Sequence, residues 1–297
     1  MTYKRRDFIK ATTAIASGIA ITSIAGKFTG CISTNKTAAY NPVFGIQLYT
    51  LRDEMPKDPK GILKQLSSFG YKQIESYEHN TLGMFWGMKN TEFKQYLDSL
   101  GMKIVSSHAD IYKDFERKAG EAAAIGMDYL ICPSLGSQKS LDAFKKAADK
   151  FNECGAICKR NGLRFAYHNH DYSFQLLDGQ YPQDVMMNAT SKDLVDYQMD
   201  IYWVVTAGQE PVQWMNKYPN RFRLAHVKDR IKNAPLTEKN ASTTVGTGSI
   251  NFEEILSAGK NLGLAYFIVE QERYDGTTPL KAAQDSAAFM KNLKIKV

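Results

Sequence analysis

Imidazole and carboxylate side chains recur at the ends of short apolar runs in this sequence. Of the five histidines, four occupy such positions and only His79 lies elsewhere. The four are His108, His168, His170 and His226. Acidic residues in equivalent positions include Glu75, Asp200, Glu270 and Glu272. Imidazole and carboxylate ligands together suit Mn, Zn, Co or Mg better than a metal that prefers thiolates, so we expect these residues to hold one divalent ion.

The expected metal ligands come from successive apolar runs. Side chains two apart on an extended strand share a face. The pairs placed side by side in this way are His168 with His170, His226 with Lys228, and Glu270 with Glu272. We expect Asp200, His226 and Glu270 to bind the metal, with His168 as the fourth ligand. The alternative for each is a hydrogen-bonded polar group that lines a sugar pocket without metal.

The segments that must position these residues alternate between short β-branched runs and longer amphipathic stretches. The expected strands are 44–49, 73–75, 103–107, 129–132, 164–168, 195–200, 223–227 and 266–270. The expected helices are 58–69, 91–100, 113–125, 140–161, 182–190, 210–218, 252–262 and 278–293. This alternation predicts an α/β fold, a closed (β/α)8 TIM barrel, with its active site at the carboxyl ends of the strands. An open doubly wound sheet is the alternative, but no glycine-rich phosphate loop follows the first strand.

The first 31 residues have the composition of a leader rather than of a folded core. The basic segment 4–10, which contains Arg5 and Arg6, precedes a small apolar run over 11–25 and resembles a twin-arginine export signal. An ordinary secretion signal is the alternative, and a lipid anchor at Cys31 is open. We expect residues 32–40 to be a linker and 41–297 the catalytic domain, exported to the periplasm or held at the cell envelope.

Charge and cysteine content narrow the function classes further. Residues 1–31 contribute five of the 38 basic and one of the 31 acidic groups, so the rest of the chain has a net charge near +3. No Lys/Arg stripe is evident, and we therefore expect no nucleic-acid partner. Cys132, Cys154 and Cys158 form no zinc-binding or disulfide pattern and are expected to be buried thiols.

The chain beyond the leader resembles the sugar phosphate isomerase/epimerase family of xylose isomerase-like barrels. The matching segments are 45–52, 167–172, 199–203, 226–229 and 245–252. In related ketose epimerases Glu, Asp, His and Glu hold one divalent ion, and the resemblance implies Asp200, His226 and Glu270 for the last three. His168 stands where the first glutamate is expected. That glutamate also moves a proton, so the departure bears on both metal affinity and epimerase chemistry.

The reaction expected from this resemblance is proton transfer at a carbon next to a sugar carbonyl, assisted by the metal. Glu270 is the expected ligand and proton carrier on one face. His168 or His170 serves the other, because the pKa of histidine, about 6.5, lies near the working pH. Lys228 is expected to pair with a carboxylate or a substrate oxygen, with a Schiff base as the alternative. The expected substrate-binding residues are Gln47, Glu75, His108, Trp203 and Glu272.

Three other functions remain open at this point. The resemblance extends to exported bacterial proteins that act on 3-keto-glycosides, so the expected substrate is a carbohydrate without phosphate. Proton abstraction followed by loss of a leaving group would make the enzyme a lyase or hydratase. Because His168 replaces the first expected glutamate, the chain could instead be a sugar-binding barrel without catalytic activity. An apurinic-site endonuclease shares this barrel but uses more histidines, and it is the least favoured.

Overall fold

The computed structural model of the chain describes residues 39–296 and confirms the expected barrel. Eight parallel strands close in the order β11-β2-β3-β4-β5-β6-β7-β8. They are β2 (Gly45–Gln47), β3 (Gln73–Tyr77), β4 (Lys103–His108), β5 (Tyr129–Cys132), β6 (Arg164–His168), β7 (Val195–Asp200), β8 (Phe222–Val227) and β11 (Tyr266–Val269). The expected export signal and Cys31 lie outside the described residues.

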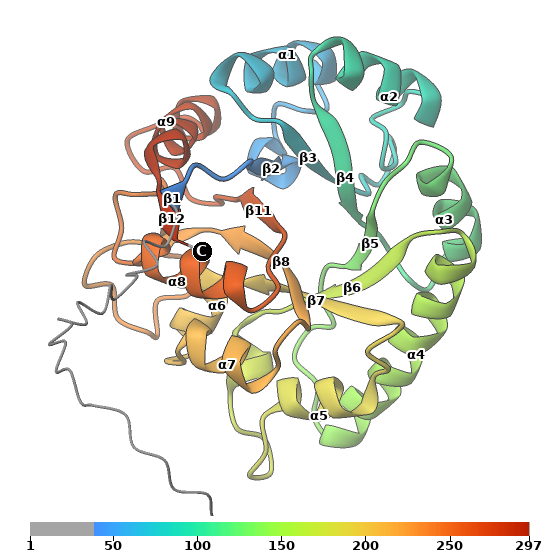
Figure 1. Cartoon of the computed structure of the whole chain (residues 1–297), viewed down its shortest axis with the longest axis vertical. Coiled ribbons are helices and arrows are strands. Elements are labelled where there is room, and N and C mark those ends of the chain that lie inside the picture. Colours follow the sequence, from blue (N-terminus) through green and yellow to red (C-terminus); the bar gives the residue numbers. More distant parts are fainter. Residues whose placement is uncertain (1–38, 297) are drawn as a thin grey trace, which may run out of the picture. The chain divides into compact units, whose positions relative to one another are not determined.

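Helices surround the ring of strands (Figure 1). They are α1 (Pro59–Phe69), α2 (Asn90–Ser99), α3 (Phe115–Ala123), α4 (Leu141–Arg160), α5 (Pro182–Ala189), α6 (Ile201–Thr206), α7 (Pro211–Lys217), α8 (Phe252–Asn261) and α9 (Pro279–Asn292). All except α6 coincide, within two residues at each end, with the helices expected from the sequence. None of the helices in the described part of the chain is long and apolar enough to cross a membrane.

The barrel interior changes from apolar to polar along the strands. Its lower part is filled by a small cluster of Tyr129, Ile131, Ala166 and Leu224, against which Tyr266 packs. The main apolar core lies outside this cluster and includes residues from both the strands and the surrounding helices. Since alternate side chains of a strand point inward, the polar residues nearer the carboxyl ends meet inside the same ring.

An early strand end and an additional helix were not expected, and both arise because a side chain caps the turn that follows a strand. The first strand ends at Gln47, whose side chain accepts a hydrogen bond from the Tyr49 amide at 3.0 Å and starts the 3-10 turn η1 (Leu48–Leu51). Likewise α6 begins directly after β7, because Asp200 caps it by accepting from the Trp203 amide at 3.1 Å. Polar residues at strand ends therefore serve local structure as well as the site.

Short strand pairs outside the barrel were not expected. The last two residues of the expected linker form β1 (Ala39–Tyr40), which pairs antiparallel with β12 (Ile295–Lys296). In the loop after β8, β9 (Asp229–Arg230) pairs with β10 (Ser242–Thr243). Runs of two residues give no periodic signal in a sequence.

Gly155 lets α4 approach the chain at Leu194, just before β7. A Cβ at this position would lie 2.5 Å from the Leu194 carbonyl oxygen, which is backbone and cannot swing away. Gly155→Ala should therefore destabilise the fold by about 1–3 kcal/mol. The matched control is Gly120→Ala in α3, where the nearest atom lies 4.0 Å away; it should stabilise by about 0.5–1 kcal/mol. Urea unfolding measures both, and equal effects would contradict this packing.

Candidate metal centre and active site

Four side chains from consecutive strands of the barrel converge at its carboxyl end. Asp200 ends β7 and lies in register with His226 on β8; His168 ends β6, and Glu270 follows β11 directly. The Nδ1 atom of His226 lies 3.2 Å from Glu270 Oε2 and 3.8 Å from Asp200 Oδ2. The Nε2 atom of His168 lies 3.8 Å from the same Asp200 oxygen. The expected ligand set is thus brought together, and all four side chains are buried.

The fit of a metal is best judged at Asp200. Its Oδ2 atom is buried and has no hydrogen-bond partner among the described residues. A buried carboxylate oxygen without a partner is costly. Ligands bound at about 2.0–2.2 Å around a tetrahedral ion lie roughly 3.3–3.6 Å apart, close to the separations observed here. These donors therefore suit a divalent ion, and Asp200, His226 and Glu270 form a group with ligand atoms within 4.8 Å of one another.

Charge balance at this end of the barrel also favours a cation. Four carboxylates lie together: Glu75, Asp200, Glu270 and Glu272. The Lys228 ammonium contacts three of them, at 3.8 Å from Asp200, 3.2 Å from Glu270 and 2.6 Å from Glu272. Surplus negative charge in a buried space requires compensation.

Gln47 and Glu75, expected to bind substrate, lie completely buried beneath the candidate ligands. Glu75 accepts hydrogen bonds from Gln47 Nε2 at 2.8 Å and from Ser106 Oγ at 2.6 Å. It also accepts from Gln198 Nε2 at 2.7 Å and from His226 Nε2 at 2.5 Å. All of these partners are protein side chains, and the expected role of Gln47 and Glu75 in substrate binding stays a prediction.

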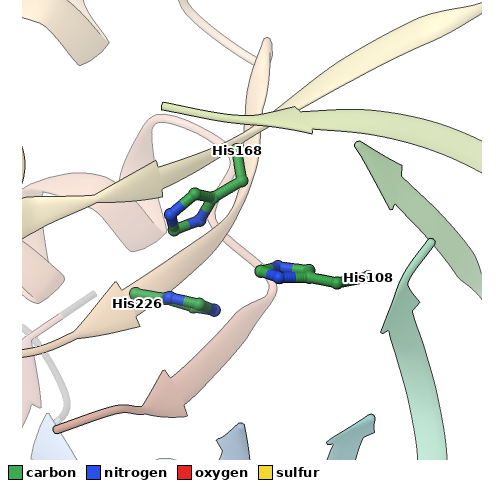
Figure 2. Close-up of side chains that lie close together, drawn as sticks. All are labelled: His108, His168 and His226. Atoms are coloured by element: carbon green, nitrogen blue, oxygen red, sulfur yellow. The ribbon is translucent and has the colours of Figure 1, made fainter. Parts of the chain in front are cut away.

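A third histidine joins the two candidate ligands (Figure 2). Figure 2 shows the rings of His108, His168 and His226 gathered between the strand ends, and their ligand atoms lie within 4.8 Å of one another. His108 Nε2 and His168 Nδ1 both contact Gln198 Oε1, at 2.9 and 3.0 Å. Gln198 was not singled out from the sequence. The available signal was its parity, since it precedes Asp200 by two residues and therefore shares its face.

Burial and neighbouring charges shift the pKa values of the clustered histidines and of Glu75 in different directions. Burial would lower the pKa of His226, but the carboxylates of Glu270 and Glu75 raise it well above its ordinary value. Burial would raise the pKa of Glu75, but the neighbouring imidazoles and the Ser106 hydroxyl lower it to about 2. Burial lowers the pKa of His168 well below its ordinary value and that of His170 to about 4. His226 is therefore cationic in the metal-free protein, while His168 and His170 are neutral.

Lys228 is held as an ammonium ion. Burial would lower its pKa, but the carboxylates of Glu270, Asp200 and Glu272 raise it. A Schiff base requires the neutral amine, so the expected pairing with carboxylates is favoured over that alternative. The Lys228 Nζ atom also lies 5.1 Å from the centroid of the Trp203 ring, where a cation–π contact is favourable.

An open cavity of about 580 Å³ lies above these residues. His108, His168, His170, Glu270 and Glu272 are among its lining residues. Tyr49, Tyr77 and His79 line it as well, so the one histidine placed elsewhere by sequence reasoning also faces the cavity. His79 follows β3 in a loop, and its position could not be read from strand parity. The size and polar lining suit a small polar ligand.

His170 and Trp203 form one side of this region. Their rings lie 5.3 Å apart, and His170 stacks on Tyr172 with ring centroids 5.7 Å apart and an interplanar angle of 4°. The Nδ1 atom of His170 is buried without a hydrogen-bond partner among the described residues. Trp203, expected as an aromatic wall for a sugar ring, thus packs on His170 and Lys228. His170 is also one of the residues that line the ligand cavity.

The glycine motif after β8 does not serve as an anion-binding loop. The amides of Gly246 and Gly248 each donate to Asp229 Oδ2 at 2.9 Å, and the Ile250 amide donates to Asp229 Oδ1 at 3.2 Å. In many barrels the loops after the last strands bind phosphate. Here a carboxylate of the protein itself occupies those donors.

Known proteins resemble this chain in both sequence and fold. A family model described as xylose isomerase-like TIM barrel matches residues 63–293. An inosose dehydratase of Clostridium beijerinckii is 27% identical over 159 residues, which are 49% of this chain and 49% of that protein. The matched region therefore spans about half the length of such curated relatives.

Two solved structures extend the comparison over most of the chain. A sugar phosphate isomerase/epimerase from Parabacteroides distasonis is 28% identical with a TM-score of 0.72, covering 85% of this chain and 94% of that one. The IolI protein with a bound zinc atom has the same fold at 17% identity and a TM-score of 0.70, covering 84% and 96%. Because the family model matches well over half of its length, the chain belongs to the xylose isomerase-like TIM barrel family.

Proposed function

We propose that this protein is a metal-dependent sugar isomerase or epimerase that moves a proton at a carbon next to a carbonyl group. The observation that carries the proposal is the convergence of His168, Asp200, His226 and Glu270 around an unpartnered carboxylate oxygen at the base of the cavity. The 28% identical isomerase/epimerase supports the same reaction class.

One divalent ion, Mn, Zn, Co or Mg, is the proposed cofactor. His168, Asp200, His226 and Glu270 would hold it. The second imidazole, in place of a carboxylate, favours Zn or Co over Mg, and the zinc-bound IolI structure is consistent with that choice. When bound, the ion supplies positive charge that stabilises a developing negative charge on the substrate oxygen.

The residues of the chain divide the proton transfer between two sides of the substrate. Glu270 is ionised and lines the cavity directly after β11, while His170 is neutral and lines it from the loop after β6. Inversion requires one of these groups to remove the proton while the other, after taking a proton from water, delivers it to the opposite face. Proton exchange with water then returns both groups to their starting states. The Lys228 ammonium holds Glu270 and Glu272 in place from beneath.

The proposed substrate is an unphosphorylated keto-sugar. The amides of the glycine loop already bind the Asp229 carboxylate, which leaves them without capacity for a phosphate group. Export to the cell envelope, as proposed from residues 1–31, would also separate the protein from phosphorylated sugars of the cytoplasm.

Elimination is the second candidate, and the inosose dehydratase relatives favour it. Removal of the same proton, followed by departure of water or a sugar substituent from the β carbon, requires no other arrangement of ligands. The two reactions differ in what leaves the substrate after the proton has been removed.

Turnover of a 3-keto-glucoside in deuterated water distinguishes these reactions. Epimerisation predicts deuterium at the carbon next to the carbonyl with the glycosidic bond intact, whereas elimination predicts release of the substituent. Glu270→Gln should reduce either rate by about 10²–10⁴-fold. Glu253→Gln, at a surface ion pair with Lys296, is the control and should act as wild type. If neither deuterium incorporation nor release of the substituent is seen with any of the four metals, a non-catalytic sugar-binding barrel would be the better description.

Replacing His170 separates a role in proton transfer from a role in metal binding. His170→Phe keeps the stack on Tyr172 but removes both ring nitrogens. We expect turnover to fall by about 10²–10⁴-fold while the dissociation constant for the metal stays within twofold of the wild-type value. Calorimetry and mass-spectrometric rate assays measure the two quantities. Unchanged turnover would exclude His170 as the proton carrier.

Metal binding should compete with a proton on His226. Its raised pKa leaves the ring protonated at neutral pH in the metal-free protein, and a ligating imidazole must lose that proton. We therefore expect release of about one proton per ion, and an affinity that falls about tenfold for each pH unit below the His226 pKa. Calorimetry in buffers with different ionisation enthalpies measures this release. An affinity independent of pH would contradict it.

A further inference from the structure

Glu75 and Gln198 form a buried hydrogen-bonded pair beneath the candidate metal ligands. Both side chains are completely buried, and Gln198 Nε2 lies 2.7 Å from Glu75 Oε2. Pairing between strands is irregular immediately before each residue, between Ile74 and Glu75 and between Tyr197 and Gln198. Such irregularities often re-aim side chains next to active sites.

The donors and acceptors of this pair follow from elementary chemistry. The ionised carboxylate of Glu75 can only accept hydrogen bonds, so the Gln198 amide nitrogen must face it and donate. The Gln198 carbonyl oxygen then faces the histidines and can only accept. His108 Nε2 and His168 Nδ1, at 2.9 and 3.0 Å from that oxygen, must therefore both carry hydrogen.

The same reasoning applies to His226. Its Nε2 atom lies 2.5 Å from Glu75 Oε1 and must donate to it. With hydrogen on Nε2, the His226 nitrogen that can bind a metal is Nδ1, which faces Asp200 and Glu270. For His168, with hydrogen on Nδ1, the lone pair is on Nε2, which faces Asp200. The two histidines thus present opposite ring nitrogens to one point.

We propose that Glu75 and Gln198 are positioning residues that fix which ring nitrogen of His226 and of His168 faces the metal. The inference rests on the proposed metal site but concerns residues that contact neither ion nor substrate. Outer partners of ligating histidines set ring orientation and basicity, and their loss commonly weakens metal binding by about 10–100-fold.

Nitrogen-15 spectra of the histidine rings test the proposal directly in the wild-type chain. In the zinc-loaded protein, His226 should coordinate through Nδ1 with hydrogen on Nε2, and His168 should show the reverse pattern. In the metal-free protein, neutral His168 should carry its hydrogen on Nδ1. Coordination of both rings through the same nitrogen, or hydrogen on Nε2 of metal-free His168, would overturn the assignment.

Two substitutions test the same point by affinity. Gln198→Met preserves side-chain length but removes the acceptor for His168. Glu75→Gln places an amide donor among the four side-chain donors that point at the Glu75 carboxylate. Each should weaken zinc binding by about 10–100-fold, and Gln198→Met should give a mixture of hydrogen positions on metal-free His168. Gln183→Met, which replaces a buried glutamine on α5, and Asp196→Asn, at the Arg164 ion pair, are the matched controls.

The outcomes separate this inference from the proposed function. Wild-type affinity in both Gln198→Met and Glu75→Gln, with the His168 spectrum unchanged, would overturn the positioning role even if the enzyme is metal-dependent. Absence of any zinc binding to the wild type would overturn the proposed cofactor. In that case the metal-free His168 spectrum alone still decides the role of Gln198.

Discussion

Negative charge buried inside a closed barrel is the constraint on which the rest of this structure depends. Alternate side chains of each strand must point inward. Carboxylates stand at Glu75 within β3, at Asp200 at the end of β7 and at Glu270 directly after β11. Solvent cannot reach Glu75 or Asp200 to screen them. The surrounding imidazoles, the Lys228 ammonium and a divalent ion are the groups that offset this charge, and each must lie at a defined place to do so.

His168, at the end of β6, changes the charge of the candidate ligand set but keeps the four ligands together. A neutral imidazole in place of a carboxylate removes one negative charge from the ligand set, and Gln198 holds that imidazole with its Nε2 toward Asp200. The proton-carrying role expected of the missing glutamate then passes, in our proposal, to His170. Its place in the lining of the cavity and its neutral state at physiological pH meet that requirement.

The barrel and the convergence of Asp200, His226 and Glu270 could be predicted from the sequence, because both follow from the alternation of short strands with helices. Asp200 and His226 stand at or next to the carboxyl ends of the expected strands 195–200 and 223–227, and these ends meet on one face of a barrel. The roles of Glu75 and Gln198 could not be predicted in this way. These two residues are 123 apart along the chain and form a hydrogen bond with each other. Closure of the barrel and two irregularities in strand pairing bring them together.

Loop residues and short caps escaped prediction for a different reason. His79 lies on the cavity wall in a loop with no periodicity, and α6 is six residues long and begins at a side-chain cap supplied by Asp200. These features depend on single hydrogen bonds and turns rather than on a repeated pattern. Sequence reasoning therefore located the centre of the site more accurately than its walls.

Elemental analysis of the protein purified from its native compartment without chelators tests the central claim most directly. The account predicts about one equivalent of Mn, Zn, Co or Mg per chain, lost when Asp200 is replaced by alanine. Full turnover by a chain that contains none of these metals would contradict it.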